Sequence, residues 1–113
     1  MNQISDRLSV VLPAYNEQSV LLQTYARFTA MGSVLAESGL DYELVFVNDG
    51  SEDETPMILD SFAASDLHVR VVHFTRNFGH QAAVTAGLKM ARGDVVAIMD
   101  CDLQDPPEIL PKF

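Results

Sequence analysis

Residues 95–108 read V-V-A-I-M-D-C-D-L-Q-D-P-P-E, an apolar run followed at once by acidic and turn-forming residues. The run predicts a buried strand, whose carboxyl end is where an open α/β sheet normally presents its binding residues. Asp100, Asp102 and Gln104 are spaced by two, so an extended backbone points all three side chains to one side. Oxygen ligands suit Mg²⁺ or Mn²⁺, which fill their remaining positions with water and substrate phosphates. The stretch therefore predicts a metal bridge to a diphosphate.

Three further apolar runs precede this one, at residues 8–12, 43–48 and 69–74, and each predicts a strand. Helical patterns separate the four runs, from about residue 16 to Gly39, about 53 to 64 and about 81 to 91. This alternation with short connections predicts a Rossmann-like, doubly wound parallel sheet in three α/β/α layers. A strand order of 3-2-1-4 would open the ligand crevice between the first and fourth strands.

Local signals predict where these elements begin and end. Pro13 lacks a donor and is expected to close the first strand. Asn16 is a plausible N-cap of the first helix, and Ser51 with Glu54 fits a capping box before the second. Small residues in the third helix predict close packing on the sheet.

The unusual side chains follow the ends of the strands and therefore gather at one edge of the sheet. Tyr15 and Glu17 follow the first strand, Asp49 the second and Arg76 the third. The opposite ends carry plainer connectors. This asymmetry is the strongest sequence argument for a binding site.

Each acidic candidate also has a structural interpretation. Asp100 and Asp102 could serve loop solubility and a helix cap, although two carboxylates held together repel each other unless a dication is bound. Gln104 could be a metal ligand, a hydrogen-bond donor or a loop filler. Asp49 and Glu17 could each stabilise the positive end of a helix, worth about 0.3 to 1 kcal/mol, or contact a ligand, a nucleobase in the case of Asp49.

The other two candidates are equally open. Tyr15 could pack against its neighbours or offer its ring as a platform for a base. Arg76 could form a surface salt bridge, or meet a phosphate together with free backbone N–H groups of the following helix.

The composition and charge exclude several classes of function. With 113 residues, 48% of them hydrophobic, the chain has the composition of one ordinary folded domain. A net charge of −9 argues against nonspecific binding to nucleic acid or anionic lipid. Cys101 is the only cysteine, which excludes an intrachain disulfide, and we expect its side chain to point into the core. No apolar stretch approaches the roughly 18 to 20 residues that span a bilayer, and no secretion signal is expected.

Four motifs resemble the family 2 inverting glycosyltransferases, above all the polyprenyl-phosphate sugar transferases such as bactoprenol glucosyltransferases and dolichol-phosphate mannose synthases. They are L-S-V-V-L-P-A-Y-N-E at residues 8–17, V-F-V-N-D-G-S at 45–51, T-R-N-F-G-H-Q-A-A-V-T-A-G-L at 75–88 and G-D-V-V-A-I-M-D-C-D-L-Q-D-P-P-E at 93–108. Their order and their spread over nearly the whole chain make the resemblance far more specific than an isolated D-x-D.

The resemblance implies a site and a reaction. In that family the positions of Asp100, Asp102 and Gln104 hold Mg²⁺ or Mn²⁺ on the donor diphosphate, such as that of UDP-glucose. The positions of Pro13, Tyr15, Glu17 and Asp49 hold the nucleoside, and Arg76 lies near the donor. A polyprenyl phosphate oxygen then attacks the anomeric carbon with inversion, while the metal offsets charge on the leaving nucleoside diphosphate.

Members of that family run on for roughly another hundred residues that build the acceptor side. We therefore expect residues 1–113 to be the donor-binding half of the catalytic domain and to be inactive alone, with the acceptor-side catalytic residues outside the chain. The parent enzyme is expected at the cytoplasmic face of the membrane, in cell-envelope synthesis. An exposed edge of the fourth strand would allow a homo-oligomer to form.

Two other interpretations remain at this stage. A non-catalytic nucleotide-binding or regulatory module would keep the same crevice and transfer nothing. A phospho-acceptor or phosphatase domain would require a key carboxylate after the first or third strand and a partnering lysine. Those positions offer Pro13 and Thr75, and the lysines are Lys89 and Lys112.

Overall fold

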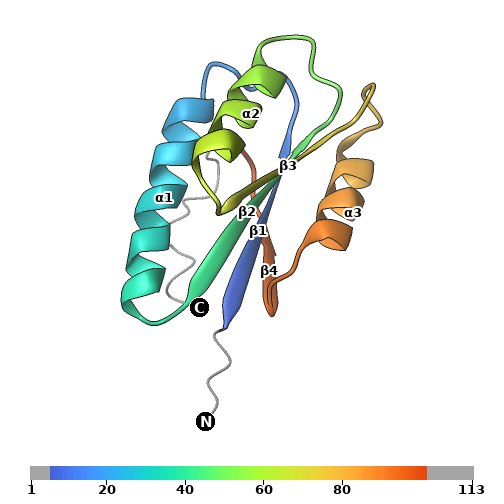
Figure 1. Cartoon of the computed structure of the whole chain (residues 1–113). Coiled ribbons are helices and arrows are strands. Elements are labelled where there is room, and N and C mark those ends of the chain that lie inside the picture. The colour runs from blue at the N-terminus through green and yellow to red at the C-terminus, as the bar shows by residue number, and fades with distance from the viewer. Residues whose placement is uncertain (1–5, 102–113) are drawn as a thin grey trace.

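The protein, examined as a computed structural model, is described for residues 6–101 and alternates strands with helices from end to end (Figure 1). Runs of apolar residues form strands because both of their faces are covered, and the amphipathic segments between them form the covering helices. The elements are β1 (Arg7–Ala14), α1 (Leu21–Glu37), β2 (Asp41–Asn48), α2 (Thr55–Ser65), β3 (Val69–His73), α3 (His80–Met90) and β4 (Val95–Ile98).

The four strands form one parallel sheet in the order β3-β2-β1-β4, as predicted. Figure 1 shows α1 and α2 on one face and α3 on the other, which confirms the three layers. The order reverses at β1, whose neighbours are β2 and β4. The topological switch point, where ligands bind in such sheets, therefore lies between the carboxyl ends of β1 and β4.

The main core lies between the sheet and the pair α1 and α2. Its largest fully buried side chains include Phe28 of α1, Leu59 of α2 and Phe46 of β2. On the other face, Val45 and Val47 pack with Ala83 of α3. A Cβ at Gly87 would lie 2.3 Å from Val11 Cγ1, so the predicted close packing of α3 is confirmed.

The predicted start of the first helix at about residue 16 is wrong, and neither predicted cap forms, because Asn16 and Ser51 bond across loops instead of capping locally. The second and third helices begin within two residues of their predicted starts. Asn16 has φ 52° and its Oδ1 accepts from Glu52 N, while α1 begins at Leu21. Ser51 Oγ accepts from Asn16 N, and α2 begins at Thr55, so the capping box with Glu54 does not form.

The predicted end of the first helix is confirmed. Gly39 has φ 80°, and its N–H donates to the Ala36 carbonyl while the Leu40 N–H donates to the Leu35 carbonyl. These two bonds form a Schellman motif, which glycine favours because it adopts positive φ without strain.

Pro13 does not close β1, which continues to Ala14. The Val11 carbonyl accepts from Met99 N, so alternate residues of β1, Pro13 included, direct their backbone groups toward β4. The pairing of β1 with β4 ends at Val11 and Ile98, and because Pro13 has no N–H to donate, it cannot continue this ladder.

β4 is an edge strand among the described residues, and the prediction that it is buried is wrong. Its Val95 side chain is 62% exposed, and Val96 and Ile98 are also exposed. Within residues 6–101 the strand pairs with β1 alone, while α3 packs on β1 and β2. Within residues 6–101, no helix combines the length and apolarity needed to cross a membrane.

Candidate functional site

A cleft of about 490 Å³ opens at the switch point. Five predicted site residues line it, and they come from the tips of β1, β2 and β4: Pro13, Tyr15, Glu17, Asp49 and Asp100. Asn77, Gly79 and His80, at the start of α3, complete its wall together with Ala14 and Cys101. The strand order thus brings together side chains that lie as far apart in sequence as Pro13 and Asp100.

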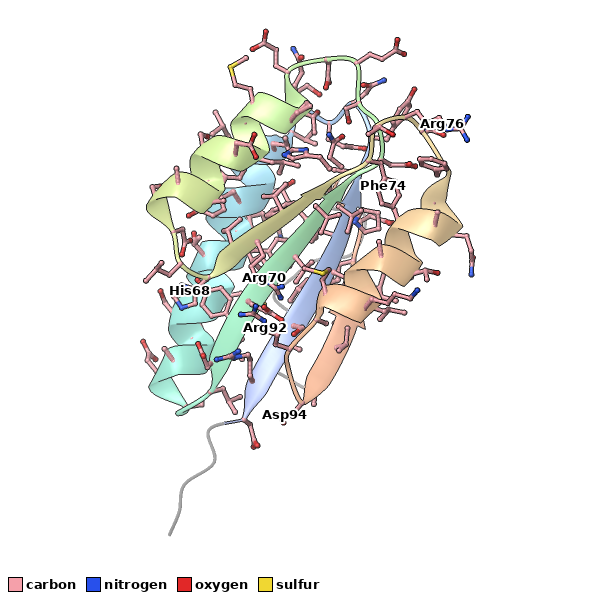
Figure 2. All side chains as sticks on the ribbon, turned by 45° about the vertical axis from the view of Figure 1, so that its right-hand side comes forward. His68, Arg70, Phe74, Arg76, Arg92 and Asp94 are labelled. Carbon is pink, nitrogen blue, oxygen red and sulfur yellow. The ribbon has the colours of Figure 1, made fainter. Side chains whose placement is uncertain are left out.

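A second cavity of about 620 Å³, here called the outer cavity, lies beside this cleft. The loops after β2 and β3 line it, and it shares Tyr15 and Asn77 with the switch-point cleft. Arg76 lines the outer cavity and not the cleft. Its guanidinium carbon lies 4.5 Å from the centre of the Phe78 ring, and Figure 2 shows Arg76 pointing outward at this end of the sheet. The structure therefore places Arg76 at the margin of the predicted site.

The loops after β1 and β2 are joined by reciprocal hydrogen bonds. Glu17 N donates to Thr55 Oγ1 at 2.9 Å, and Gln18 N donates to Asp53 Oδ2 at 3.3 Å. In the other direction, Glu54 N donates to Gln18 Oε1 at 2.9 Å. The bonds of Asn16 with Ser51 and Glu52 add to this set. Because each loop satisfies backbone donors of the other, both are held as one rim of the cleft.

One of these rim contacts also changes a pKa. Burial alone would raise the pKa of the Asp53 carboxyl, but hydrogen bonds from Thr55 and Gln18 outweigh that effect and lower it. The ionised carboxylate is therefore the form that the rim stabilises.

Asp49 joins the loop after β3 to this rim. Its carboxylate accepts from Phe78 N at 2.7 Å, from Gly79 N at 3.1 Å and from Asn77 Nδ2 at 3.3 Å. Only 4% of Asp49 is exposed. Neighbouring Gly50 packs against the same loop, where a Cβ would lie 2.1 Å from the Arg76 carbonyl carbon. Asp49 therefore holds the start of α3 against the cleft, and its contact with a nucleobase stays a prediction.

Tyr15 and Glu17 lie on the β1 side of the cleft. Tyr15 is 42% exposed, so its ring is available to a ligand and is not a core aromatic. Glu17 is half-buried and its carbonyl accepts from Val20 and Leu21 N–H groups, which begins the turn into α1. Both side chains remain candidates for donor contact.

Asp100 reaches the cleft because the residue after it is anchored in the core. Cys101 is 2% exposed, as predicted, and its carbonyl accepts a hydrogen bond from Thr24 Oγ1 of α1. Asp100 itself is half-buried at the cleft wall. Thr24 belongs to the buried face of α1, and its anchoring role depends on a contact between residues 77 positions apart, which no local pattern reveals.

The predicted metal ligands Asp102 and Gln104 lie outside the described residues. Within 6–101, no group of three or more His, Cys, Asp and Glu side chains is close enough to hold a metal. Asp100, the described member of the set, supplies a carboxylate oxygen at the cleft wall, and a hard oxygen donor suits Mg²⁺ or Mn²⁺. Its position fits the predicted metal, and the complete ligand set stays a prediction.

The comparisons with known proteins agree with this architecture. The sequence profile of the family described as "Glycosyl transferase family 2" matches residues 9–113. The chain belongs to glycosyl transferase family 2. The resemblance of the four motifs is thereby confirmed.

Several curated relatives are similar over almost the whole chain. It is 45% identical over 102 residues to a protein of Bacillus subtilis named uncharacterized glycosyltransferase YkcC, covering 90% of this chain and 31% of that protein. It is 43% identical over 107 residues to an undecaprenyl-phosphate 4-deoxy-4-formamido-L-arabinose transferase of Pseudomonas fluorescens (94% and 30%). A prophage bactoprenol glucosyl transferase homolog of Escherichia coli is 40% identical over 108 residues (93% and 33%). The chain thus spans about a third of the length of these relatives.

Solved structures of glycosyltransferases share the fold. The mannosyltransferase PcManGT of Pyrobaculum calidifontis, in complex with GDP-Man and Mn²⁺, matches with a TM-score of 0.76 and 26% identity, covering 94% of this chain and 30% of that one. The S. aureus protein TarS, residues 1–349 in complex with UDP-GlcNAc, matches with a TM-score of 0.72 and 26% identity (85% and 26%). The Rossmann-like sheet of this chain is therefore the A-type glycosyltransferase fold.

Proposed function

We propose that residues 1–113 are the donor-binding half of a metal-dependent inverting glycosyltransferase. The enzyme would transfer a sugar from a nucleotide-diphosphate sugar, such as UDP-glucose, to a polyprenyl phosphate. The observation that carries the proposal is the switch-point cleft, which Pro13, Tyr15, Glu17, Asp49 and Asp100 line together in a chain of this family.

The comparisons support the substrate classes. PcManGT is in complex with GDP-Man and Mn²⁺, and TarS is in complex with UDP-GlcNAc. Two relatives carry undecaprenyl-phosphate or bactoprenol in their names, which supports a polyprenyl phosphate as acceptor. Because this acceptor is a membrane lipid, we place the whole enzyme at the cytoplasmic face of the membrane.

In the proposed complex, the described residues bind and orient the donor. The exposed ring of Tyr15 offers a face to the nucleobase. The amino end of α3 meets the cleft at Gly79 and His80, where the positive end of the helix dipole favours a phosphate, although the Gly79 N–H itself donates to Asp49. Arg76 lines the outer cavity beside the cleft and would bring a positive charge near the donor.

Asp100 supplies a carboxylate to the cleft wall. Asp100, with Asp102 and Gln104, would hold Mg²⁺ or Mn²⁺ on the donor diphosphate. When bound, such a metal neutralises charge on the departing nucleoside diphosphate. The net charge of −9 makes that neutralisation necessary, because an anionic donor approaches an acidic protein.

Calorimetric titration tests the proposal. UDP-glucose, UDP-N-acetylglucosamine and GDP-mannose are titrated into the chain with and without Mn²⁺, and the series is repeated on Asp100→Asn and Asp102→Ala. Asp94→Asn is the matched control, because it makes the same chemical change at the opposite end of the sheet (Figure 2). We expect Mn²⁺ to tighten binding of one donor at least tenfold, about 1.4 kcal/mol, in the wild type and the control only.

Two results would contradict the proposal. Binding of equal strength with and without Mn²⁺ in all four proteins would exclude the metal bridge. Failure of all three donors to bind would exclude a donor site in this chain.

A further inference from the structure

A chain of hydrogen bonds joins α2, β3 and β2 at the floor of the outer cavity. His73 Nε2 lies 2.7 Å from Asp60 Oδ1, and His73 Nδ1 lies 3.0 Å from Asn48 Nδ2. Asn48 Oδ1 accepts from Ser51 N at 2.9 Å. Asn48 and His73 are register partners on β2 and β3, so their side chains stand next to each other on one face.

The backbone fixes the protonation state that this chain of bonds requires. Ser51 N–H can only donate, so Asn48 must turn Oδ1 toward it and its NH₂ group toward His73. The NH₂ group then needs an acceptor at Nδ1, which leaves the imidazole proton on Nε2, facing Asp60. Only neutral His73 with its proton on Nε2 satisfies all three contacts.

Protonation of His73 breaks this arrangement. A proton on Nδ1 would face the NH₂ group of Asn48, placing two donors against each other. Rotating the Asn48 amide by half a turn would offer Oδ1 to the protonated Nδ1 of His73. The same rotation would place the NH₂ group against the Ser51 N–H, so two donors would again oppose each other. Asn48 is 3% exposed, so water replaces the lost bond poorly.

Three charged side chains surround the outer cavity at His73. Asp60 of α2 contacts the ring directly, and its side chain is 65% exposed and therefore screened by solvent. Glu52 and Arg76, of opposite charge, line the same cavity. The neutral neighbour Asn48 is the contact that protonation directly removes.

Asn48 occupies the junction of the loops that form the rim. It precedes Asp49, which holds Phe78 and Gly79, and its partner Ser51 accepts from Asn16 N. We propose that His73 is a proton-sensitive positioning residue: neutral His73 fixes Asn48 and the loop after β2 for donor binding, and protonated His73 loosens that loop. The link to donor binding rests on the proposed function, whereas the loosening of the loop does not.

Hydrogen exchange of the Ser51 amide, without ligand, tests the loosening. Protection factors, which correct for the pH dependence of intrinsic exchange, are measured at about pH 8 and about pH 5.5, on either side of the usual titration range of histidine. In the wild type we expect the protection of Ser51 to fall about threefold to tenfold at the lower pH, the factor that one net hydrogen bond corresponds to.

Three variants make the test specific. His73→Asn leaves an oxygen where Nδ1 accepts but cannot be protonated in this range, so Ser51 protection should become independent of pH. Asn48→Asp places a carboxylate against Nδ1, so protection should rise on acidification instead of falling. His68→Asn changes a histidine that bonds Asp66 near the opposite end of the sheet and should behave as the wild type (Figure 2).

Two results of the exchange experiment would contradict the inference. Unchanged Ser51 protection in the wild type, or the same pH dependence in His73→Asn as in the wild type, overturns the inference. A general destabilisation by acid would lower Ser51 protection in every variant. The expected rise of Ser51 protection in Asn48→Asp on acidification distinguishes the inference from that effect.

Titration of UDP-glucose with Mn²⁺ at the same two pH values tests the link to binding. Both of its phosphates are esterified, so its charge does not change in this range. We expect wild-type affinity to fall at the lower pH by the factor seen in exchange and the affinity of His73→Asn to stay level. Equal pH dependence in both proteins overturns the link. Absence of binding at both pH values contradicts the proposed function, and the exchange result then decides the inference about His73.

Discussion

Replacing Asp49 with Asn would remove the carboxylate that joins the loop after β2 to the loop after β3. The single oxygen of the new amide can still accept from Phe78 N, which lies 2.7 Å from Asp49 Oδ1 in the wild type. The NH₂ group that replaces Oδ2 would face Gly79 N and Asn77 Nδ2, which lie 3.1 and 3.3 Å from that atom. Donors would then oppose donors in a position that is 4% exposed.

The geometry sets the size of the effect. A hydrogen bond to a charged group contributes about 1.5 to 3 kcal/mol. Asp49→Asn loses both contacts of Oδ2, although Gly79 N also lies 3.3 Å from Oδ1 and Asn77 Nδ2 lies 3.2 Å from the Asp49 carbonyl oxygen, so each donor keeps one acceptor. The loop lies at the surface and can partly open to water, so we expect a loss of about 2 to 3 kcal/mol in the free energy of unfolding. For a domain of this size, that loss lowers Tm by roughly 10 to 20 °C.

Urea unfolding of the chain at neutral pH measures this loss, and hydrogen exchange at Phe78 and Gly79 localises it. Asp94→Asn is the matched control, because the exposed Asp94 carboxylate accepts from Arg7 N and an amide oxygen can replace it there. The control should lose no more than about 0.5 kcal/mol. If Asp49→Asn loses as little as the control, the carboxylate does not hold the two loops together.

Three other predictions concern the sheet. Burial would raise the pKa of Glu43, but bonds from Ser9, Arg92 and Arg70 outweigh it and lower the pKa. Glu43→Gln should therefore cost about 3 kcal/mol at neutral pH by urea unfolding, and this difference should shrink as pH falls from about 4.3 through the lower folded pKa. A cost that is constant down to about pH 2 would contradict this. Gly87→Ala should lose about 1 to 3 kcal/mol despite better helix propensity, because its Cβ would lie 2.3 Å from Val11 Cγ1; a stabilised variant would refute the close packing. The exposed β4 edge should allow self-association at high concentration, and Val96→Lys should reduce it; a strictly monomeric wild type in sedimentation would count against this.

The sequence was sufficient for the sheet and for most of the cleft because both depend on signals that act over short distances. Continuous apolar runs mark strands buried on both faces, and the polar residues just after them must meet at one edge of a parallel sheet. Tyr15, Glu17, Asp49 and Asp100 were found in this way, whereas Pro13 came from the family resemblance, and all five line one cleft.

The wrong predictions of helix caps arose where a residue bonds across the fold rather than along the chain. Asn16 and Ser51 have the side chains of helix caps, but each satisfies the other loop's backbone. Thr24 looked like one more buried helix position, yet it anchors the chain next to Asp100. His73 has no motif around it, and its relation to Asn48 exists only because β2 and β3 pair in that register.

The central claim is that the metal and donor diphosphate bind between the tips of β1 and β4. The most direct test is paramagnetic broadening of backbone amide signals by Mn²⁺ in the presence of UDP-glucose. We predict that Ala14, Gly79 and Asp100 broaden first, while Gly39 and Gly93 at the opposite end of the sheet stay sharp, and that Asp102→Ala abolishes the pattern. Broadening centred on Gly39 or Gly93, or an unchanged pattern in Asp102→Ala, would contradict the claim.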